Sequence, residues 1–389
     1  MYFKKNRLGV KLKKLLRPLA WLYRGLKGVS ECRRLRKHIS GVDIPKSGVA
    51  AGYITREFPA PPPRRDQPAN GGAIKMVYLA EDIPASPDRC NVLYAVSSVL
   101  HPQTSTILAA ARHRGMKIVW NQNGVCYRGW FGEGWEEVNK NLARSLHQAD
   151  YVIYQTRFCE MAADKFLGSY AGPKEVMFNP VDLSHFTPTP HREIGDELIL
   201  CTVGSATAYY RLESALRAVS LVAKEWPRLR FLIAGSIIHQ NSDAIMARTL
   251  ALIQELNLSD HVTFLGPFTQ QDAPDIYRQA HILVHTPYND NCPTVVQEAM
   301  ACGLPVAYSD SGGTPELVGP DAGIGVSVPL DWENRHPLDP AALAAAILRI
   351  TDSWPDKSQA ARERAVEHFD LQQFNARHRA IFERLLEER

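Results

Sequence analysis

The 389-residue sequence has no stretch of about 18 to 20 uncharged apolar residues, which excludes a membrane-spanning helix. It also lacks a cleavable signal pattern at its start and any Cys-x-x-Cys pair, and its seven cysteines are scattered along the chain. We therefore expect reduced thiols and a cytosolic location.

Patterns typical of metal and nucleic-acid sites are missing as well. There is no Asp-x-Asp triplet and no His/Cys cluster with metal-ligand spacing, so we expect no essential metal and no cofactor. No basic stripe interleaved with aromatic residues occurs, so nucleic acid is not an expected partner.

Positive charge is concentrated at the start of the chain. Residues 1–40 contain thirteen Lys and Arg against one acid, so they carry +12, and because the whole chain carries +4 the remainder carries −8. Leucines from Leu8 to Leu26 recur at helical spacing, which predicts a basic amphipathic arm over residues 1–45. We expect residues 1–40 to bind an anionic membrane surface peripherally, at the inner face of the membrane. The alternatives are a solubilising tail or a helix that packs on its own protein.

Short β-branched or aromatic runs alternate with helix-length stretches along the rest of the chain, which indicates parallel strands of α/β domains. A proline-containing segment after residue 179 interrupts the alternation. The expected strands are 49–55, 90–96, 117–121, 150–155 and 175–178, then 198–204, 230–235, 261–266, 282–287, 305–310 and 323–328. We therefore predict two doubly wound domains, 46–182 and 183–367, and a C-terminal helix, 368–389, which could cross back to the first domain. Two such domains form a cleft where the carboxyl ends of their strands meet, so functional residues are expected in the loops after strands.

The stretch DNCPTVVQE, residues 290–298, combines such a loop with the start of a helix. Pro293 suits the first helical turn, and the free N–H groups near Thr294 and Val295 can receive a phosphate or sugar oxygen. Glu298 falls at the edge of the buried arc, where a carboxylate can accept two hydroxyls such as those of a ribose. Asp290 precedes the helix. The alternative is an ordinary polar loop that enters an ordinary helix.

With its flanks, this stretch resembles the retaining glycosyltransferases of family 4. The family has a Glu-x7-Glu motif, present here as Asp290-x7-Glu298, followed by AMACGLPVAYSD and the turn Gly312-Gly313-Thr314-Pro315-Glu316. The resemblance extends over about residues 49–389. It implies an α/β, GT-B fold, in which two Rossmann-like doubly wound domains face a central cleft.

The resemblance also implies roles for individual residues. Glu298 would bind the ribose of a nucleoside-diphosphate sugar, and Asp290 would contact the donor sugar near the reacting carbon. The implied donor-binding positions are Glu298, Thr294, Val295, Gly204, Gly71 and Gly72. A plain turn is the alternative for the Gly71-Gly72 pair.

Two departures from the family concern catalysis. Asp290 is one methylene shorter than the usual Glu, and of the usual Arg and Lys that neutralise the donor diphosphate only Arg211 remains, shifted by about one position. Asp290 and Arg211 are thus the catalytic candidates. Loss of one cationic contact could cost a few kcal/mol unless another residue substitutes for it.

The acceptor is expected on the first domain, at residues 125–139. This glycine-containing stretch holds several aromatic residues, among them Tyr127, whose rings could stack on sugars, or which could form a buried cluster. The acceptor-side candidates are Asn123, Arg128 and Trp130.

Together these features predict a retaining hexosyltransferase that moves a sugar from a nucleoside diphosphate to a glycan or lipid-linked acceptor, in envelope polysaccharide or lipopolysaccharide biosynthesis. Two alternatives remain: a catalytically silent GT-B homologue that binds nucleotide or glycan, and a GT-B sugar-nucleotide epimerase.

Overall fold

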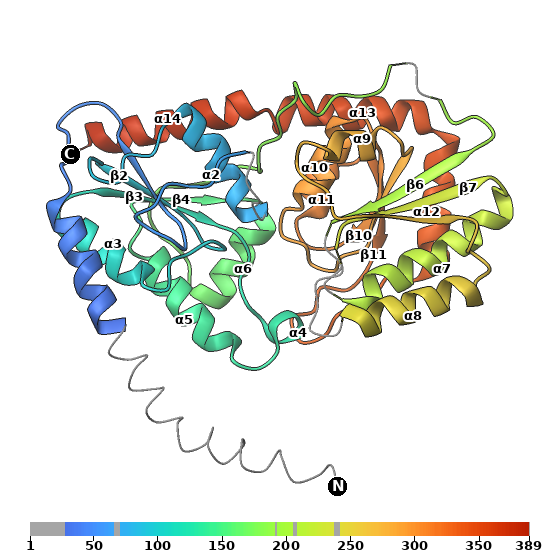
Figure 1. Ribbon diagram of the computed structural model, residues 1–389, viewed down its shortest axis with the longest axis horizontal. Helices are drawn as coiled ribbons and strands as arrows, with labels where there is room; N and C mark the ends of the chain where they lie inside the picture. Colours follow the sequence, from blue (N-terminus) through green and yellow to red (C-terminus); the bar gives the residue numbers. More distant parts are fainter. Residues whose placement is uncertain (1–27, 66–70, 191–192, 205–207, 237–241, 389) are drawn as a thin grey trace, which may run out of the picture.

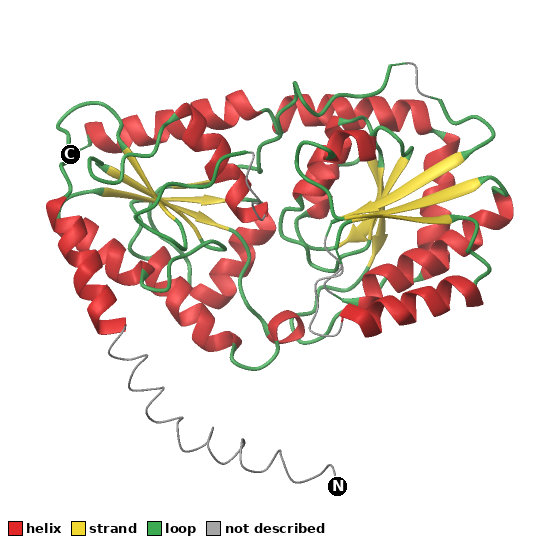
Figure 2. Ribbon diagram, viewed as in Figure 1, coloured by secondary structure: helices red, strands yellow, loops and turns green. Residues whose placement is uncertain are grey.

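The computed structural model consists of two α/β domains side by side, each built around a parallel sheet (Figures 1 and 2). The structure describes residues 28–65, 71–190, 193–204, 208–236 and 242–388. All eleven runs expected as strands form strands, so the predicted fold class of two parallel α/β domains is confirmed.

The first domain has a five-stranded sheet in the order β1-β2-β3-β4-β5, with every pair parallel. Its strands are β1 (Ala51–Ile54), β2 (Val92–Val96), β3 (Lys117–Gln122), β4 (Tyr151–Tyr154) and β5 (Lys174–Val176). Its helices are α2 (Gly71–Asp82), α3 (Thr104–His113), α4 (Arg128–Phe131), α5 (Trp135–Leu146) and α6 (Arg157–Leu167). Helix α2 covers one face of the sheet, and α3, α5 and α6 cover the other, so β1 to β4 are buried on both faces.

The second domain has a six-stranded parallel sheet in the order β11-β10-β9-β6-β7-β8. Its strands are β6 (Leu198–Val203), β7 (Leu229–Ala234), β8 (Val262–Gly266), β9 (Ile282–His285), β10 (Val306–Asp310) and β11 (Gly323–Ser327). Its helices are α7 (Tyr209–Glu225), α8 (Ser242–Glu255), α9 (Ala273–Tyr277), α10 (Thr294–Ala301), α11 (Thr314–Val318), α12 (Pro340–Asp352) and α13 (Trp354–His368). One face packs on α9, α10, α11 and α13, and the other on α7, α8 and α12.

The C-terminal helices join the domains. Helix α13 packs on the second domain, and α14 (Leu371–Glu387) packs on the first, where Phe374 and Phe382 are buried against the sheet (Figure 1). At the crossing point, the N–H of Val181 donates to the carbonyl of Phe369 over 2.7 Å. The two segments that connect the domains therefore lie side by side.

The described part of the predicted N-terminal arm belongs to the first domain. Residues 28–41 are helical, and Leu35 and Ile39 are buried in its core, whereas Arg33 and Arg36 are exposed. For residues 28–41 the structure thus shows a helix whose apolar face is covered by its own protein, which was one of the alternatives for this segment. Residues 1–27 lie outside the described residues. None of the helices in the described ranges combines the length and apolarity needed to cross a bilayer.

The two domains also meet through polar contacts. The carboxylate of Glu316 accepts the N–H groups of Arg157 and Phe158, at the start of α6, over 2.8 Å each. Thr156 donates its hydroxyl to the carbonyl of Asn291 over 3.0 Å. These bonds hold the loop before α10 against the first domain.

Candidate functional site

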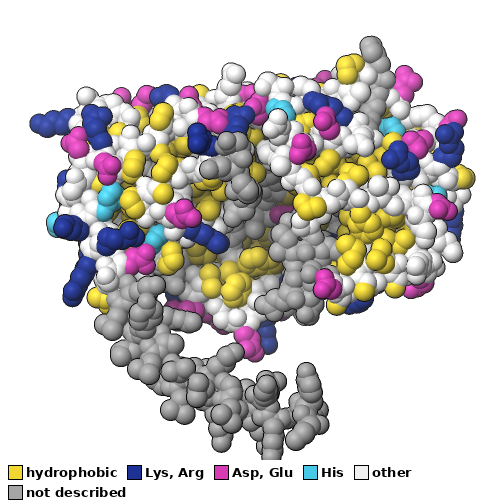
Figure 3. Space-filling view, in the orientation of Figure 1, with side chains coloured by type: hydrophobic (Ala, Val, Ile, Leu, Met, Phe, Trp, Pro, Cys, Tyr) yellow, Lys and Arg dark blue, Asp and Glu magenta, His cyan; other side chains and the backbone are white. Residues whose placement is uncertain are grey.

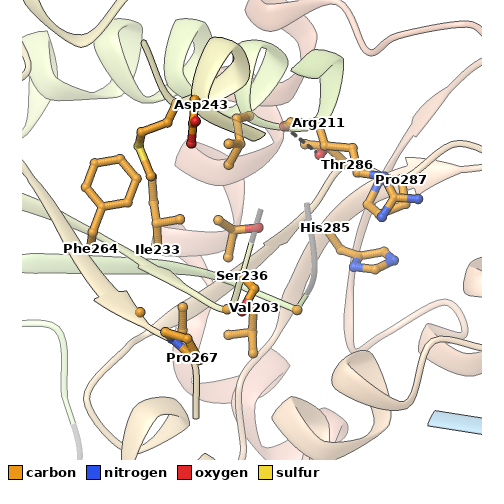
Figure 4. A pocket seen from close by; sticks show the side chains of 17 residues that line it. Val203, Arg211, Ile233, Ser236, Asp243, Phe264, Pro267, His285, Thr286 and Pro287 are labelled. Carbon is orange, nitrogen blue, oxygen red and sulfur yellow. Dashed lines mark hydrogen bonds between the residues drawn. The ribbon is translucent and has the colours of Figure 1, made fainter. Parts of the chain in front are cut away.

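A cavity of about 390 Å³ lies at the carboxyl ends of β6, β7, β8 and β9 (Figure 4). Gly204, Arg211, His285 and Thr286 are among the residues that line it. The carbonyl of Arg211 accepts the Thr286 hydroxyl over 2.8 Å, which fixes the start of α7 to the end of β9. This is the edge at which open parallel sheets bind ligands.

Gly204 connects this cavity to the start of α10. Its φ of +111° is a conformation that side chains disfavour, and a Cβ built on it would lie 3.6 Å from the Val295 side chain. Two of the predicted donor-binding residues are therefore neighbours. Any larger residue at position 204 would be strained and would crowd the space between β6 and α10.

Two basic residues act on Asp290. Its Oδ2 atom is 3.4 Å from Nε2 of the buried His285. Burial alone would raise the pKa of Asp290, but the close contact with His285 and the charge of Arg211 outweigh burial, so its pKa is lowered. The structure thus brings the two catalytic candidates within electrostatic reach of each other and keeps Asp290 ionised at neutral pH.

Helix α10 starts without a side-chain cap. Pro293 occupies the N-cap position, one residue before the first turn predicted for it, and has no side-chain hydrogen-bonding group to offer. Among the described residues, no acceptor is found for the N–H groups of Thr294 and Val295. These donors and the helix dipole make the start of α10 suitable for an anionic or hydroxyl oxygen.

Glu298 is fully enclosed rather than at the edge of a buried arc, with 3% of its surface exposed. It accepts hydrogen bonds from Gln270 Nε2 over 2.7 Å and from the Tyr277 hydroxyl over 2.9 Å. Burial raises its pKa to about 7, although these two hydrogen bonds offset part of the shift. Because a carboxylate offers about four acceptor positions, two remain for further hydroxyls. Glu298 does not line the 390 Å³ cavity, unlike Gly204 and Arg211.

The first-domain candidates gather at the start of α2. The helix begins at Gly71, and a Cβ on Gly72 would collide with the Ser98 hydroxyl. Asn123 donates to the same hydroxyl over 2.7 Å and accepts a hydrogen bond from Lys75 Nζ over 3.1 Å. Gly72 and Asn123 therefore both lie against Ser98, and Gly71 precedes them at the first residue of the helix.

The predicted aromatic segment, residues 125–139, contains both buried and exposed rings. Tyr127 is 5% exposed and packs against Phe166 and Trp332, as in the buried-cluster alternative. Trp130 and Phe131, in α4, are 50% and 45% exposed. The side chain of Arg128 is largely exposed and lies 3.8 Å from the carboxylate of Glu333.

Helix α4 is fixed to the second domain. The N–H of Gly129 donates to the carbonyl of Trp332 over 2.8 Å, and Arg335 donates to the carbonyls of Gly129 and Trp130 over 2.8 and 2.7 Å. Beside these contacts lies a second cavity, of about 240 Å³. Its lining consists of Tyr127, Trp130, Phe131, Ala208, Tyr210, Arg211, Tyr288 and Arg335. Arg211 lines both cavities, so they adjoin each other.

Four residues that contact the predicted site residues or their neighbours were not themselves predicted from the sequence: His285, Lys75, Trp332 and Arg335. A signal existed for His285, which is an ionisable residue inside the expected strand 282–287. Lys75 offered a similar signal as a charged residue on the apolar side of a helix. Nothing in the sequence places Trp332 and Arg335 beside α4. In the part of the chain that the structure describes, no group of three or more His, Cys, Asp or Glu could hold a metal ion.

Comparisons of the sequence with known proteins match mainly the second domain. Residues 186–368 match the family model described as "Glycosyl transferases group 1". The chain is 32% identical to D-inositol 3-phosphate glycosyltransferase of Streptomyces bingchenggensis over 195 residues, which is 46% of this chain and 42% of that protein. It is 25% identical to the gpi3 subunit of phosphatidylinositol N-acetylglucosaminyltransferase of Schizosaccharomyces pombe over 211 residues, 54% of this chain and 44% of that subunit. The chain thus spans less than half of the length of these curated relatives.

Solved structures extend the similarity to both domains. HepE of Anabaena in complex with UDP superposes with a TM-score of 0.65 at 15% identity, over 84% of this chain and 98% of that one. Sucrose-phosphate synthase of Thermosynechococcus elongatus superposes with a TM-score of 0.57 at 22% identity, over 82% of this chain and 77% of that one. The chain therefore has the GT-B fold, and its second domain matches the group 1 glycosyltransferases.

Proposed function

We propose that the protein is a retaining glycosyltransferase that moves a sugar from a nucleoside diphosphate to a glycan or lipid-linked acceptor. The observation that carries the proposal is the position of Asp290, an ionised carboxylate 3.4 Å from His285, under the influence of the charge of Arg211 and in the loop before the uncapped start of α10. The carboxylate of Asp290 and the positive charge of Arg211 and of the helix start are therefore in place before a substrate binds. Such preorganised charge is what a reaction with an anionic leaving group requires.

In this proposal the nucleotide occupies the cavity at the ends of β6 to β9. Its diphosphate lies near Arg211 and the N–H groups of Thr294 and Val295, and its ribose extends beyond the lining of this cavity to Glu298. The group 1 match of this domain and the UDP complex of the Anabaena structure support this placement. Arg211 and the helix start supply the positive charge, so we assign no role to a metal.

Asp290 would accept a hydroxyl of the donor sugar and orient its anomeric carbon toward the acceptor. In a same-face reaction, the bond from that carbon to the phosphate oxygen breaks as the bond to the acceptor oxygen forms, and the departing phosphate takes the acceptor proton. Arg211 would stabilise the negative charge that gathers on the phosphate. The protein contributes orientation and electrostatics, without a covalent intermediate on a side chain.

The acceptor would enter through the 240 Å³ cavity, which adjoins the donor cavity at Arg211. Trp130 and Phe131 present exposed rings there, and aromatic faces are suited to stacking on sugars. Asn123 and Arg128 are further acceptor-side candidates, although they do not line this cavity.

We further propose that the protein binds the inner face of the membrane peripherally and acts in envelope polysaccharide or lipopolysaccharide assembly. The proposal rests on the basic amphipathic pattern of residues 1–27 and on analogy with the family. On the face drawn in Figure 3, Lys and Arg side chains gather on the left, over the first domain. Within the helix of residues 28–41, Arg33 and Arg36 are exposed.

Incubation of the purified protein with a panel of nucleoside-diphosphate sugars tests the enzymatic proposal. Release of the nucleoside diphosphate from one donor, accelerated by an acceptor glycan, is the expected result. Binding of a nucleoside diphosphate without turnover of any donor would instead indicate a silent homologue, and interconversion of two sugar nucleotides would indicate an epimerase.

A further inference from the structure

A buried amine in the first domain has no role in the function proposed so far. Lys75, one turn into α2, is 1% exposed. Its Nζ donates to Oδ1 of Asn121 over 2.8 Å and to Oδ1 of Asn123 over 3.1 Å. Both acceptors are neutral amides, and among the described residues Lys75 forms no ion pair. A buried ammonium without a counter-ion is costly, so its presence needs a physical reason.

The side of α2 that carries Lys75 faces the second domain. Tyr78, three residues later and hence on the same helix face, lies close enough to the second domain for the charge of Glu298 to act on its hydroxyl. Glu298 in turn accepts a hydrogen bond from Gln270. Lys75 therefore belongs to the same surface of the first domain that meets the candidate donor site.

Lys75 lies near the start of α10. The charge of Lys75 and that of Asp290 both act on the thiol of Cys292, the second residue before α10. The loop that carries Asn123 makes contact there too, because a Cβ on the neighbouring Gly124 would collide with the Asn291 side chain. The loop before α10 is thus under the influence of two cations. Lys75 of the first domain acts on Cys292, and Arg211 of the second domain acts on Asp290.

We propose that Lys75 is the first-domain cation of the donor site, whose ammonium binds the diphosphate of the donor near the start of α10, together with Arg211. This inference rests on the proposed function. Lys75 would supply a second cation. The segment after β6 retains only Arg211 of the Arg and Lys pair that the family resemblance leads us to expect there. A cation on each domain also makes diphosphate binding depend on the approach of the two domains.

The protonation of Lys75 gives the inference a measurable signature. Burial lowers the pKa of Lys75 to about 7, so at pH 8 the amine of the unliganded protein is largely neutral. A bound diphosphate favours the charged form, so binding at pH 8 should be accompanied by uptake of close to one proton. The ionisable groups that face Lys75 do not titrate near this pH. Burial raises the pKa of Cys292 and raises that of Cys159 to about 12, and burial lowers that of His378 to about 3.

The test is isothermal titration calorimetry of the full-length protein with UDP, GDP and ADP and with the corresponding nucleosides. It is done at pH 8 in two buffers of different ionisation enthalpy. For the wild type we expect uptake of close to one proton with the diphosphate that binds and none with its nucleoside. Lys75→Met should bind that diphosphate at least about tenfold more weakly, with unchanged nucleoside affinity and without proton uptake. Lys140→Met, which replaces an exposed lysine of α5, is the matched control and should behave as the wild type.

Each outcome decides between the two proposals. A wild-type protein that binds none of the three diphosphates overturns the proposed function and the inference with it. Diphosphate binding without proton uptake overturns the inference alone and needs no variant to fold. Uptake that persists in Lys75→Met, or diphosphate affinity within threefold of the wild type in that variant, also refutes the role of Lys75 and leaves the proposed function standing.

Discussion

The Oδ2 atom of Asp290 lies 3.4 Å from Nε2 of His285, so the loop before α10 is connected to the last residue of β9. His285 is buried at the end of its strand and cannot move far, so it fixes the position of the carboxylate. Through this contact and the charge of Arg211, Asp290 remains ionised although it is partly buried. A rigid carboxylate at this point of the cleft can orient a sugar.

Asp290→Asn should abolish most of the turnover and leave nucleotide binding intact. The amide keeps the size of the side chain but loses the negative charge that accepts a donor-sugar hydroxyl. We expect donor turnover to fall at least about a hundredfold, with the Kd for the nucleoside diphosphate within about threefold of the wild type. Asp310→Asn, at the exposed end of the neighbouring β10, is the control and should retain full turnover.

Arg211→Ala should impair both binding and turnover. Because negative charge on the diphosphate increases in the transition state, removal of the guanidinium should lower kcat by about a hundredfold and weaken diphosphate binding less. Arg217→Ala removes a guanidinium from the same helix, where it pairs with Glu213 away from the cavity, and should change neither quantity. Equal kinetics for the two variants would exclude Arg211 from the site.

Glu298→Gln should stabilise the protein in a pH-dependent manner. The folded-state pKa of Glu298, about 7, exceeds its usual value of 4.5, so the folded state binds more protons than the unfolded state between these pH values. The wild type therefore loses stability relative to the variant as pH rises from about 4.5 to 7, by up to about 3 kcal/mol. Urea unfolding of both proteins at pH 5 and pH 8 measures the difference between their free energies of unfolding. This difference would be the same at both pH values if Glu298 were not the titrating group. The variant should also bind nucleoside diphosphate more weakly at pH 8.

Trp130→Ala should affect the acceptor and not the donor. Loss of an exposed aromatic face from the 240 Å³ cavity should raise the acceptor KM roughly tenfold, while slow hydrolysis of the donor in the absence of acceptor stays unchanged. Val366→Ala, an equally exposed apolar position on α13, serves as the control. A parallel loss of donor hydrolysis in Trp130→Ala would indicate that the ring supports the donor site instead.

Membrane binding should depend on the basic residues before residue 28. Replacement of Lys11, Lys13 and Lys14 by Gln in the full-length chain should weaken binding to phosphatidylglycerol-containing vesicles by about a hundredfold, at roughly 1 kcal/mol for each charge. Vesicles of pure phosphatidylcholine are the control surface. If flotation with anionic vesicles is the same for both proteins, these residues are not a membrane anchor.

The sequence was sufficient for the fold because buried parallel strands are continuous apolar runs, and each expected run formed a strand. The sequence was not sufficient where contacts between distant segments determine how a helix packs. Residues 28–41 were included in the basic arm predicted from the leucine spacing before them, but in the structure Leu35 and Ile39 face the core of the first domain. Amphipathicity alone does not identify what covers the apolar face.

The site was predicted in part for a similar reason. Short-range features, such as the uncapped start of α10 and the position of Asp290 before it, can be read from adjacent residues. The partners of these groups come from distant segments: His285 from β9, Gln270 from the loop before α9, and Lys75 from the first domain. Burial of Glu298 likewise depends on Tyr277 and Gln270, which no local pattern brings to it.

The central claim is that Asp290 and Arg211 serve the transfer of a sugar from a nucleoside diphosphate. The most direct measurement is nucleoside-diphosphate release from a panel of donors by the wild type, Asp290→Asn and Arg211→Ala at equal protein concentration. We predict release from one donor by the wild type and a rate at least about a hundredfold lower in each variant. Unchanged release by both variants, or nucleotide binding by the wild type with no release from any donor, would contradict the account.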